Sequence, residues 1–269
     1  MKVIKQSAHI VKEWPKMNLY ERCEFAGRIS HASEDKIKEG SAEEFVRRMV
    51  KLGHESVFEF ARVKLNYLDE NGESNPQFLN VRRLRENIKQ EDALLWNYGS
   101  IVSAVKALYP AFFDDVFEKP GINKNNFVEV ADDWIPVLIT TNRAISHQLV
   151  RYRKDVVYLQ ASQRYIKFHD DIDFISPDVY FDLDDKMFRQ WIESMEGAER
   201  DYIHCLSEGY SAQASRLFLP NSAATKLIMY ASPDTWRHVF EQRISDKADP
   251  MIRELLEPLK EEFEKEGLL

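Results

Sequence analysis

The stretch LVRYRKDVVYLQASQRY, residues 149–165, carries dense local charge and joins a helix-prone segment to a β-prone one. Arg151 and Arg153 stand near its start, and Ser162 and Arg164 stand near its end. The chain has a net charge of −8, so it does not suit a general polyanion binder. The cluster therefore predicts a local binding site, although a solvated surface or pairing with carboxylates would also account for it.

The start of this stretch continues a short predicted helix, because Ile145, Leu149 and Tyr152 recur on one helical face. That spacing would place Gln148 and Arg151 on a neighbouring face. The helix is therefore expected to present polar side chains beside a buried apolar stripe.

The end of the stretch is β-prone, since residues 156–168 are rich in β-branched and aromatic side chains. In an extended chain, Ser162 and Arg164 would share one face, because side chains alternate with a period of two. A hydroxyl beside a guanidinium can bind one phosphate. Arginine stays charged and binds phosphate through its planar fork, so the cluster points to a phosphorylated small ligand.

Upstream, residues 41–54 predict a helix with a capping box, in which Ser41 is the N-cap and Glu44 lies three residues on. Gly53 is expected to end this helix. Its buried face is expected to carry Phe45, Met49 and Leu52.

The remaining segments alternate between strand and helix patterns. Expected strands cover residues 57–67, 128–141 and 225–232, and polar loops cover 69–76 and 118–126. Expected helices cover residues 78–88, 93–110 and 186–214, and two more begin at Ser232-Pro233 and Asp249-Pro250. No glycine-rich βα turn is present, so we expect an α+β fold, with a mixed or antiparallel sheet flanked by long helices. We expect a single domain over residues 1–269 with a helical insertion at about 69–125.

The composition disfavours several classes of protein. No stretch approaches the roughly 18 apolar residues of a membrane span, and the amino end is charged, so we expect a cytoplasmic protein. Cys23 and Cys205 are far apart in sequence, which supports neither a disulfide framework nor a zinc site, and we expect no metal. The sequence lacks a P-loop, GxGxxG, HExxH or GxSxG motif, which disfavours metal hydrolysis and acyl transfer.

Four ordered segments also resemble one enzyme family. Residues 146–165 (SHQLVRYRKDVVYLQASQRY) are similar to the signature of the flavin-dependent thymidylate synthases, in which Arg-His-Arg is followed by seven residues, a serine, one residue and Arg-Tyr. Residues 53–60 (GHESVFEF) resemble the family's Gly-His-Glu-Ser segment, and residues 215–220 (SRLFLP) resemble its Ala-Arg-x-x-Leu-Pro segment. Residues 236–255 resemble its closing helix pair. The resemblance spans roughly residues 20–65 and 130–256.

The resemblance implies reductive methylation of dUMP to dTMP, with methylenetetrahydrofolate as the carbon donor. NADPH would reduce a bound FAD that supplies the hydride, so the cofactor carries the chemistry and the protein orients and polarises. A homotetramer is also implied, because the family builds each site from several subunits. No nucleic acid or membrane partner is expected.

The matching positions carry expected roles. The residues expected to hold dUMP are Gln148, Gln160, Ser162, Arg164, Arg216 and Arg243. The residues expected to hold FAD are His54, Ser56, Arg151, Tyr152, Arg153, His238 and Lys247. Ser162 and Arg243 are the expected catalytic residues, with Ser162 at the phosphate and Arg243 stabilising negative charge on the uracil ring.

This sequence departs from the family pattern at several positions. Tyr152 replaces the histidine of the triplet, and Gln160 stands where an acidic residue is common. Eight residues rather than seven separate Arg153 from Ser162, and the phosphate assignment requires a loop or a bulge to absorb the extra one. The other departures are His238, Lys247 and Met251.

These departures leave other functions open. The substrate could be a related pyrimidine nucleotide, the product could be hydroxymethylated, or the chain could be a non-catalytic nucleotide-binding relative. Residues 78–87 (FLNVRRLREN) in the expected insertion could pack beside the site or against a neighbouring subunit, but a surface helical excursion is favoured.

Overall fold

The computed structural model describes residues 1–68, 74–89, 95–115, 127–169 and 171–269. The chain divides into two compact units, and each is described by itself. Unit 1 comprises Met1–Val11, Ile29–Ala32 and Ile135–Leu269, and unit 2 comprises Lys12–Arg28 and Ser33–Trp134. The expectation of a single domain over residues 1–269 stays a prediction.

Unit 1 is built on a four-stranded antiparallel sheet in the order β2-β6-β9-β7. Its strands are β2 (Ser7–Ile10), β6 (Ile135–Asn142), β9 (Ala224–Ala231) and β7 (Val156–Gln160). The two central strands, β6 and β9, are almost wholly buried, which fits their runs of aliphatic and β-branched residues. A separate parallel pair joins β1 (Lys2–Ile4) to β8 (Asp173–Ile175).

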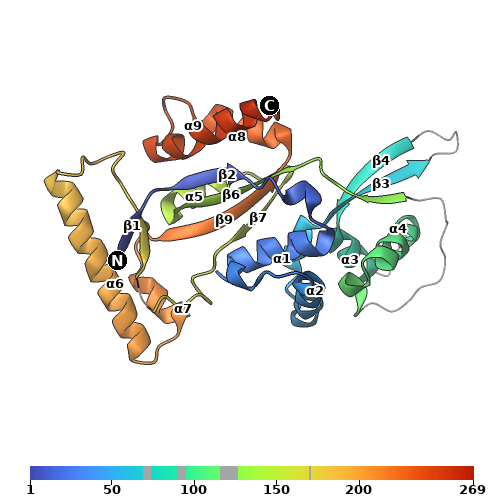
Figure 1. Ribbon diagram of the computed structural model, residues 1–269, viewed down its shortest axis with the longest axis horizontal. Helices are drawn as coiled ribbons and strands as arrows, with labels where there is room; N and C mark the ends of the chain where they lie inside the picture. The colour runs from blue at the N-terminus through green and yellow to red at the C-terminus, as the bar shows by residue number, and fades with distance from the viewer. Residues whose placement is uncertain (69–73, 90–94, 116–126, 170) are drawn as a thin grey trace. The chain divides into compact units, whose positions relative to one another are not determined.

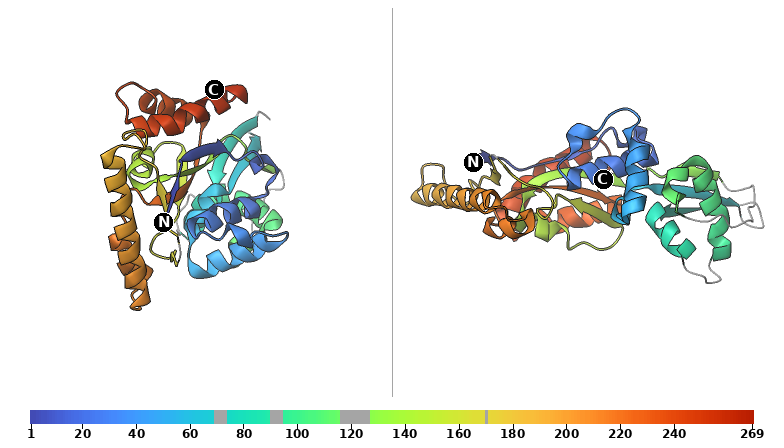
Figure 2. Two further views of the ribbon diagram at one scale, coloured as in Figure 1. Left: turned by 60° about the vertical axis from the view of Figure 1, so that its left-hand side comes forward. Right: turned by 90° about the horizontal axis from the view of Figure 1, so that it is seen from below.

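Two carboxyl-terminal helices, α8 (Pro233–Arg243) and α9 (Pro250–Lys265), lie over one face of this sheet (Figures 1 and 2). Their fully buried rings Trp236 and Phe263 pack into one core with Val137 and Leu227 of the sheet. The indole of Trp236 donates a hydrogen bond of 3.1 Å to the carbonyl of Ile135, which ties α8 to the start of β6. Both helices begin where the sequence predicted them.

The side-chain caps of these two helices are confirmed. The hydroxyl of Ser232 accepts from the Thr235 backbone N–H at 3.2 Å, and the carboxylate of Asp249 accepts from that of Met251 at 2.9 Å. Each cap satisfies a helix N–H that has no partner within the helix. A proline follows each cap at the first helical position, as predicted.

A long helix, α6 (Lys186–Ser207), packs on β8 through Met195 and Tyr202. The predicted helix of residues 186–214 is therefore too long at its end. Gly209 adopts a φ of 87°, a left-handed conformation that stops the helix. A separate short helix, α7 (Ala212–Ser215), follows and passes into the 3-10 helix η5 (Arg216–Phe218).

Unit 2 combines helices with a three-stranded antiparallel sheet in the order β4-β3-β5. The strands are β3 (Arg62–Leu68), β4 (Ser74–Asn80) and β5 (Phe127–Val130). The α-helices are α1 (Leu19–Ser30), α2 (Ser41–Leu52), α3 (Val81–Lys89) and α4 (Leu95–Leu108). The 3-10 helices are η1 (Trp14–Lys16), η2 (Glu34–Lys36), η3 (Glu55–Phe60) and η4 (Pro110–Phe113). Antiparallel sheets with helices in both units confirm the α+β class.

The helix α2 confirms the prediction for residues 41–54, but its cap differs. Gly40 is the N-cap residue and Ser41 is the first helical residue, with its hydroxyl at 2.7 Å from a carboxylate oxygen of Glu24. Gly53 ends the helix with a φ of 67°, as expected. The predicted apolar face is correct for Phe45 and Met49, which are buried, and wrong for Leu52, which is 52% exposed.

Two predicted segments of unit 2 begin later than expected. The strand predicted from residue 57 starts at Arg62, because residues 55–60 form η3. The helix predicted from residue 78 starts at Val81, because residues 74–80 form β4 instead of a loop and a first helical turn. The predicted polar loop 118–126 and residues 69–73 of the other loop lie outside the described residues.

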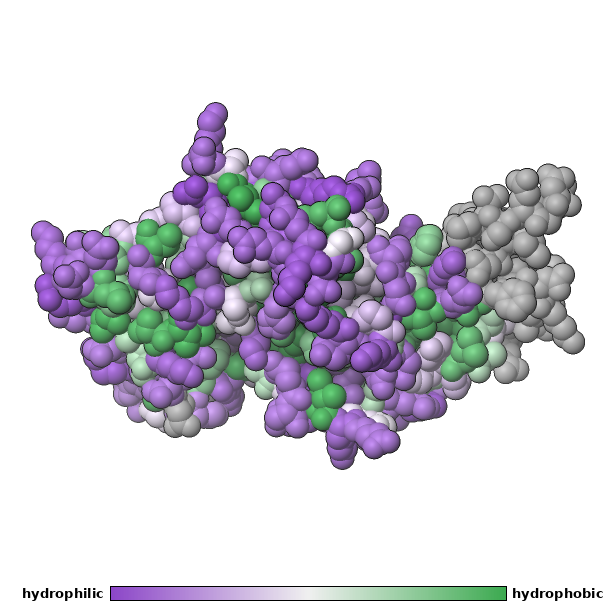
Figure 3. Space-filling model, turned by 45° about the horizontal axis from the view of Figure 1, so that its top comes forward, coloured by the Kyte–Doolittle hydropathy of each residue, from purple (hydrophilic) through white to green (hydrophobic). Residues whose placement is uncertain are grey.

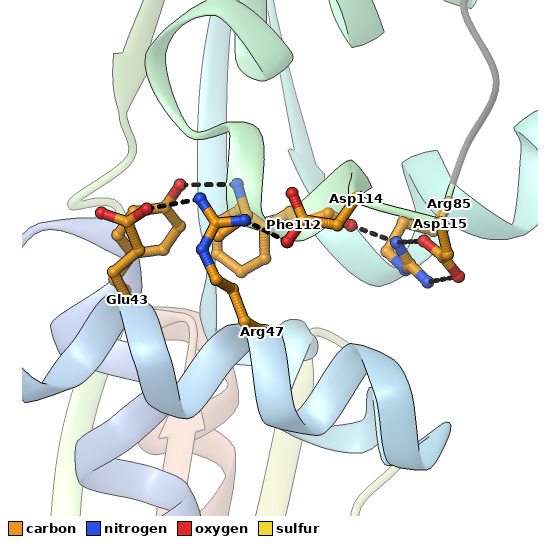
Figure 4. A network of polar contacts seen from close by, with 8 residues as sticks. Glu43, Arg47, Arg85, Phe112, Asp114 and Asp115 are labelled. Atoms are coloured by element: carbon orange, nitrogen blue, oxygen red, sulfur yellow. Dashed lines mark hydrogen bonds and ion pairs between the residues drawn. The ribbon is translucent and has the colours of Figure 1, made fainter.

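The expected insertion is fastened to the rest of unit 2 by ion pairs (Figure 4). Arg47 of α2 pairs with Glu43 on its own helix and with Asp114, which follows η4. Arg85 of α3 pairs with Glu55 of η3 at 3.0 Å, and with Asp115 inside the insertion at 2.8 Å. Arg85 is fully buried while Phe78 and Arg83 are exposed, so α3 buries one face, and the expectation of a surface excursion at residues 78–87 stays a prediction.

Hydrophilic residues cover most of the face shown in Figure 3, and the hydrophobic residues on it form separate small patches. Among the described residues, no helix is long and apolar enough to span a membrane.

Candidate functional site

An open hollow of about 630 Å³ in unit 1 brings together four of the predicted site residues. Its lining consists of His147, Gln148, Val150, Arg151, Arg153 and Arg243. Gln148 and Arg243 were predicted to hold dUMP, and Arg151 and Arg153 were predicted to hold FAD. Three guanidinium groups around one hollow in an acidic chain make this a candidate site for an anionic ligand.

A chain of hydrogen bonds orders the polar side chains at this hollow. Arg243 donates from Nε to the hydroxyl of Tyr152 at 3.1 Å and from Nη1 to Oε1 of Gln148 at 3.4 Å. Gln148 in turn donates from Nε2 to Asp249 at 3.1 Å, and the Tyr152 hydroxyl donates to Gln242 at 3.2 Å. The guanidinium of Arg243 is therefore held in one orientation while Nη2 has no protein acceptor within the described chain.

The helix α5 (Arg143–Leu149) positions the lining residues, and the local sequence explains how. Asn142 caps it, with a side-chain oxygen that accepts from the Ile145 backbone N–H at 2.9 Å. Ile145 and Leu149 are buried in the core, as their spacing predicted, so Gln148 lies on the neighbouring face beside the hollow.

Below α5, Tyr158 of β7 closes the turn that follows the helix. Its hydroxyl donates to the carbonyl of Leu149 at 3.0 Å, and burial raises the pKa of this hydroxyl above its ordinary range. Tyr158 therefore stays protonated at neutral pH and acts as a fixed donor. The backbone that carries Arg151 and Arg153 is anchored by this contact.

The extra residue between Arg153 and Ser162 does not disturb the sheet. The ladder between β7 and β9 runs without interruption from Val156 opposite Ala231 to Gln160 opposite Leu227. A continuous ladder leaves no bulge inside β7, all of which is described, so the residue is absorbed before or after this strand.

The loop before β7 is tied to the start of α8. Asp155 has a φ of 50°, a left-handed conformation that aspartate adopts more readily than most residues. Its carbonyl accepts from the Ser232 backbone N–H at 3.0 Å, and the carbonyl of Lys154 accepts from the Thr235 hydroxyl at 2.8 Å. These two hydrogen bonds therefore hold the loop in a defined conformation.

Ser162 and Arg164 lie on a turn, so the expectation that they share one face of an extended chain is wrong. The strand ends at Gln160, and the Tyr165 backbone N–H then donates to the Ser162 carbonyl at 3.0 Å. The Ser162 backbone N–H donates to the carbonyl of Ser30 at 3.0 Å. The hydrogen bond within the turn and the one to Ser30 satisfy backbone groups that an extended segment would pair with a neighbouring strand.

Side chains on both sides fasten this turn. Gln163 is 7% exposed, and its Oε1 accepts from Nη1 of Arg143 at 3.3 Å. Nη2 of Arg143 lies 3.2 Å from Nε2 of His147, which lines the hollow. The ring of Tyr165 stacks on His31 with centroids 5.8 Å apart. Arg143 thus connects the Ser162 turn to α5.

The other predicted nucleotide residues do not line the hollow in the described structure. Gln160 donates from Nε2 to the hydroxyls of Ser146 and Thr225, at 3.0 and 3.1 Å, and so joins α5 to β9. Arg216 is partly buried at the start of η5, and Arg164 is exposed with its guanidinium carbon 5.2 Å from the Tyr165 ring.

The remaining predicted flavin residues differ in their surroundings. His238 is exposed, and its ring meets Tyr152 edge to face at 5.7 Å. Lys247 is exposed in the loop between α8 and α9. His54 and Ser56 are exposed and belong to unit 2, where they follow Gly53 at the end of α2.

Sequence reasoning missed several residues of this site. Asp249 was predicted only as a cap, yet it also accepts from Gln148 and from the hydroxyl of Tyr180. Arg143 and His147 were not singled out, although their spacing of four on a predicted helix is a signal for neighbouring side chains. Gln163 gave no signal, because only the turn buries it.

Residues 135–266 match a family model described as thymidylate synthase complementing protein. This match is to just under half of the chain, and it is a similarity of that segment to the family. The matched segment contains α5, the hollow and the four-stranded sheet except β2.

Curated relatives agree with this family. The chain is 31% identical over 127 residues to a flavin-dependent thymidylate synthase of Pyrococcus horikoshii, covering 46% of this chain and 51% of that protein. It is 35% identical over 116 residues to the flavin-dependent thymidylate synthase of Geobacter sulfurreducens, covering 42% and 49%. The chain thus spans about half the length of the curated relatives it matches.

Among solved structures, the chain aligns with a UMP/dUMP methylase PolB from Streptomyces cacaoi bound with 5-Br dUMP. The TM-score is 0.47 at 14% identity, over 98% of this chain and 93% of that chain. The predicted resemblance to flavin-dependent thymidylate synthases is confirmed, and the likeness of residues 20–65 stays a prediction because they lie outside the matched segment.

Proposed function

We propose that this protein is a flavin-dependent thymidylate synthase that converts dUMP to dTMP. In the overall reaction, dUMP, methylenetetrahydrofolate, NADPH and one proton give dTMP, tetrahydrofolate and NADP⁺. The observation that carries the proposal is the oriented Arg243 at a hollow lined by arginines, inside the segment that matches the family.

Arg243 is suited to the uracil ring. Its Nε and Nη1 are engaged by Tyr152 and Gln148, so the guanidinium can present Nη2 without first being ordered by the ligand. A fixed positive charge beside the pyrimidine would stabilise the negative charge that develops on the ring when its C5 reacts. Gln148 lies next to it and can exchange its contact with Asp249 for one to the nucleotide.

The donors around the hollow fit an anionic cofactor as well. Arg151 and Arg153 are both exposed, and both line it, so their guanidinium groups would hold phosphate oxygens of FAD or of the nucleotide. When bound, FAD reduced by NADPH would supply the hydride that completes the methyl group. We assign Ser162 and Arg164 to the nucleotide phosphate, since the turn that carries them is fixed to α5 through Arg143.

The remaining assignments follow the family pattern. Gln160 and Arg216 are proposed to contact dUMP, and Tyr152, His238, Lys247, His54 and Ser56 are proposed to contact FAD. Assembly as a homotetramer is proposed on the same ground, and light scattering of the purified protein would measure it.

Product identity tests the proposal. The purified protein is incubated with dUMP, methylenetetrahydrofolate, NADPH and FAD, and the nucleotide product is identified by mass spectrometry. We expect dTMP, and we expect none when FAD is removed or when Arg243→Ala replaces the wild type. Failure to form dTMP with all four components present would overturn the proposal.

One observation favours a second candidate. Tyr152, in place of the family's histidine, bonds Arg243 with a neutral hydroxyl, which changes the charge beside the pyrimidine. A related pyrimidine nucleotide or a hydroxymethyl product would fit such a change. The same assay with UMP in place of dUMP, and the mass of the added group, decides between these reactions.

A further inference from the structure

The helix α3 of the insertion packs directly on η3, the segment that contains Glu55 and Ser56. Val81, Leu84 and Arg85 of α3 are each 0% exposed. A fully buried guanidinium is costly unless its charge is paired and its N–H groups are bonded. The residues that pair with the guanidinium of Arg85 therefore identify the segments that α3 stabilises.

Arg85 connects three segments of unit 2. Its Nη2 donates to Oε1 of Glu55 at 3.0 Å. Both Nη atoms donate to the carboxylate of Asp115 at 2.8 Å, and Nη1 also donates to the carbonyl of Phe112 (Figure 4). The guanidinium carbon lies 5.5 Å from the ring of Phe58. The fork geometry of arginine makes these contacts at once, which lysine cannot do.

A second arginine on α3 repeats the arrangement. Arg82 forms an ion pair with Glu59, which lies four residues after Glu55 on η3. Arg82 and Arg85 are three apart on the helix and therefore lie on neighbouring positions of one face. Two carboxylates of η3 are thus bound by two arginines of one helix.

Glu55 lies between His54 and Ser56, which are both exposed. The backbone N–H of His54 donates to the carbonyl of Met49 at 3.0 Å, so the chain is held on the α2 side as well. Residues 54–56 are therefore held by buried contacts of Glu55 and of the backbone, while the side chains of His54 and Ser56 are exposed to solvent.

We propose that Arg85 is a positioning residue that holds His54 and Ser56, through Glu55, in the arrangement that binds flavin. The inference rests on the proposed function, because it takes the ligand of this segment to be FAD. It gives the insertion a purpose, which is to support the segment from its buried side.

The experiment compares FAD binding in three variants of the full chain with the wild type. Glu55→Gln keeps the shape of the side chain and removes its charge, and Arg85→Lys keeps the charge and removes the fork. Arg47→Met is the matched control, because Arg47 also ties α2 to the residue after η4 but, within the described part of the chain, makes no bond to residues 54–56. FAD affinity is measured by flavin fluorescence, dUMP affinity by calorimetry, and order of residues 53–57 by amide hydrogen exchange.

We expect Glu55→Gln and Arg85→Lys to weaken FAD binding about tenfold, the size of one charged hydrogen bond. The same two variants should shift the visible flavin spectrum and speed exchange at residues 53–57, with dUMP affinity unchanged. Arg47→Met should leave FAD affinity and exchange at these residues unchanged.

Equal FAD affinity in all four proteins, or equal losses in Arg47→Met and Glu55→Gln, would overturn the positioning role. If the wild type binds no FAD at all, the proposed function itself fails, and that result is distinct from the first. Should Arg85→Lys not fold, Glu55→Gln decides alone.

Discussion

Arg243 donates a hydrogen bond of 3.1 Å to the hydroxyl of Tyr152, although 91 positions separate them in the sequence. The guanidinium carbon also lies 5.8 Å from the Tyr152 ring. The residue that departs from the family's triplet is therefore the one that orients the residue assigned to the uracil ring. The proposed function therefore depends on this contact between Tyr152 and Arg243.

Tyr152→Phe should weaken dUMP binding about tenfold, because a hydrogen bond to a charged group contributes about 1.5 kcal/mol net. The ring and its packing are retained, so the loss reports the hydroxyl alone. Calorimetric titration with dUMP measures the change. Tyr210→Phe is the control, since Tyr210 is 61% exposed, and an unchanged affinity of Tyr152→Phe would contradict the assignment.

Arg143→Met should destabilise unit 1 by about 1–3 kcal/mol, because the buried amide oxygen of Gln163 loses its donor. The loss should also lower dUMP affinity, since the turn with Ser162 is no longer tied to α5. Urea unfolding and calorimetry measure the two effects. Arg237→Met, which removes only a surface pair with Asp234, should change stability by less than about 0.5 kcal/mol.

Two substitutions of Asp155, in the loop that precedes β7, should affect stability differently. Asp155→Val should cost about 1–2 kcal/mol, because a β-branched residue is strained at a φ of 50°. Asp155→Gly should change stability by less than about 0.5 kcal/mol, since glycine adopts this conformation freely. Urea unfolding of both variants gives the comparison, and equal costs would show that the left-handed conformation is absent in solution.

The pair of Tyr180 and Asp249 predicts a change of stability at high pH. Burial, together with the hydrogen bond to Asp249, raises the pKa of Tyr180 to about 12. Protonated Tyr180 contributes to the stability of the folded state, and this contribution is fully present below the ordinary tyrosine pKa of about 10. It is lost as the pH rises toward about 12, because the unfolded chain releases the proton at a lower pH than the folded chain.

The stability difference between wild type and Tyr180→Phe should therefore shrink between about pH 9 and about pH 11. Urea unfolding at the two pH values measures it, with Tyr165→Phe as the control, because Tyr165 is similarly exposed but has no carboxylate partner among the described residues. A difference that stays constant or grows over this range would contradict the raised pKa.

Local sequence signals, such as caps and helix-ending glycines, predicted the helices and strands well where the signal lies within a single segment. Ser232 and Asp249 begin their helices as predicted, and Gly53 ends one. The boundary errors occur where a tertiary contact competes with local preference. The hydroxyl of Ser41 donates to the buried carboxylate of Glu24 on another helix instead of capping its own, and so adds to the ion pair of Glu24 with Arg28.

The sequence by itself determined the class of fold, the positions of most helices and strands, and the segments that resemble one family. These depend on periodicity, caps and spacing, which act over a few residues. Only the tertiary structure decided that Arg243 meets Tyr152, that Ser162 lies on a turn, and that Arg85 is buried against Glu55. Such contacts join residues distant in sequence, and their geometry depends on how whole elements pack around a shared core.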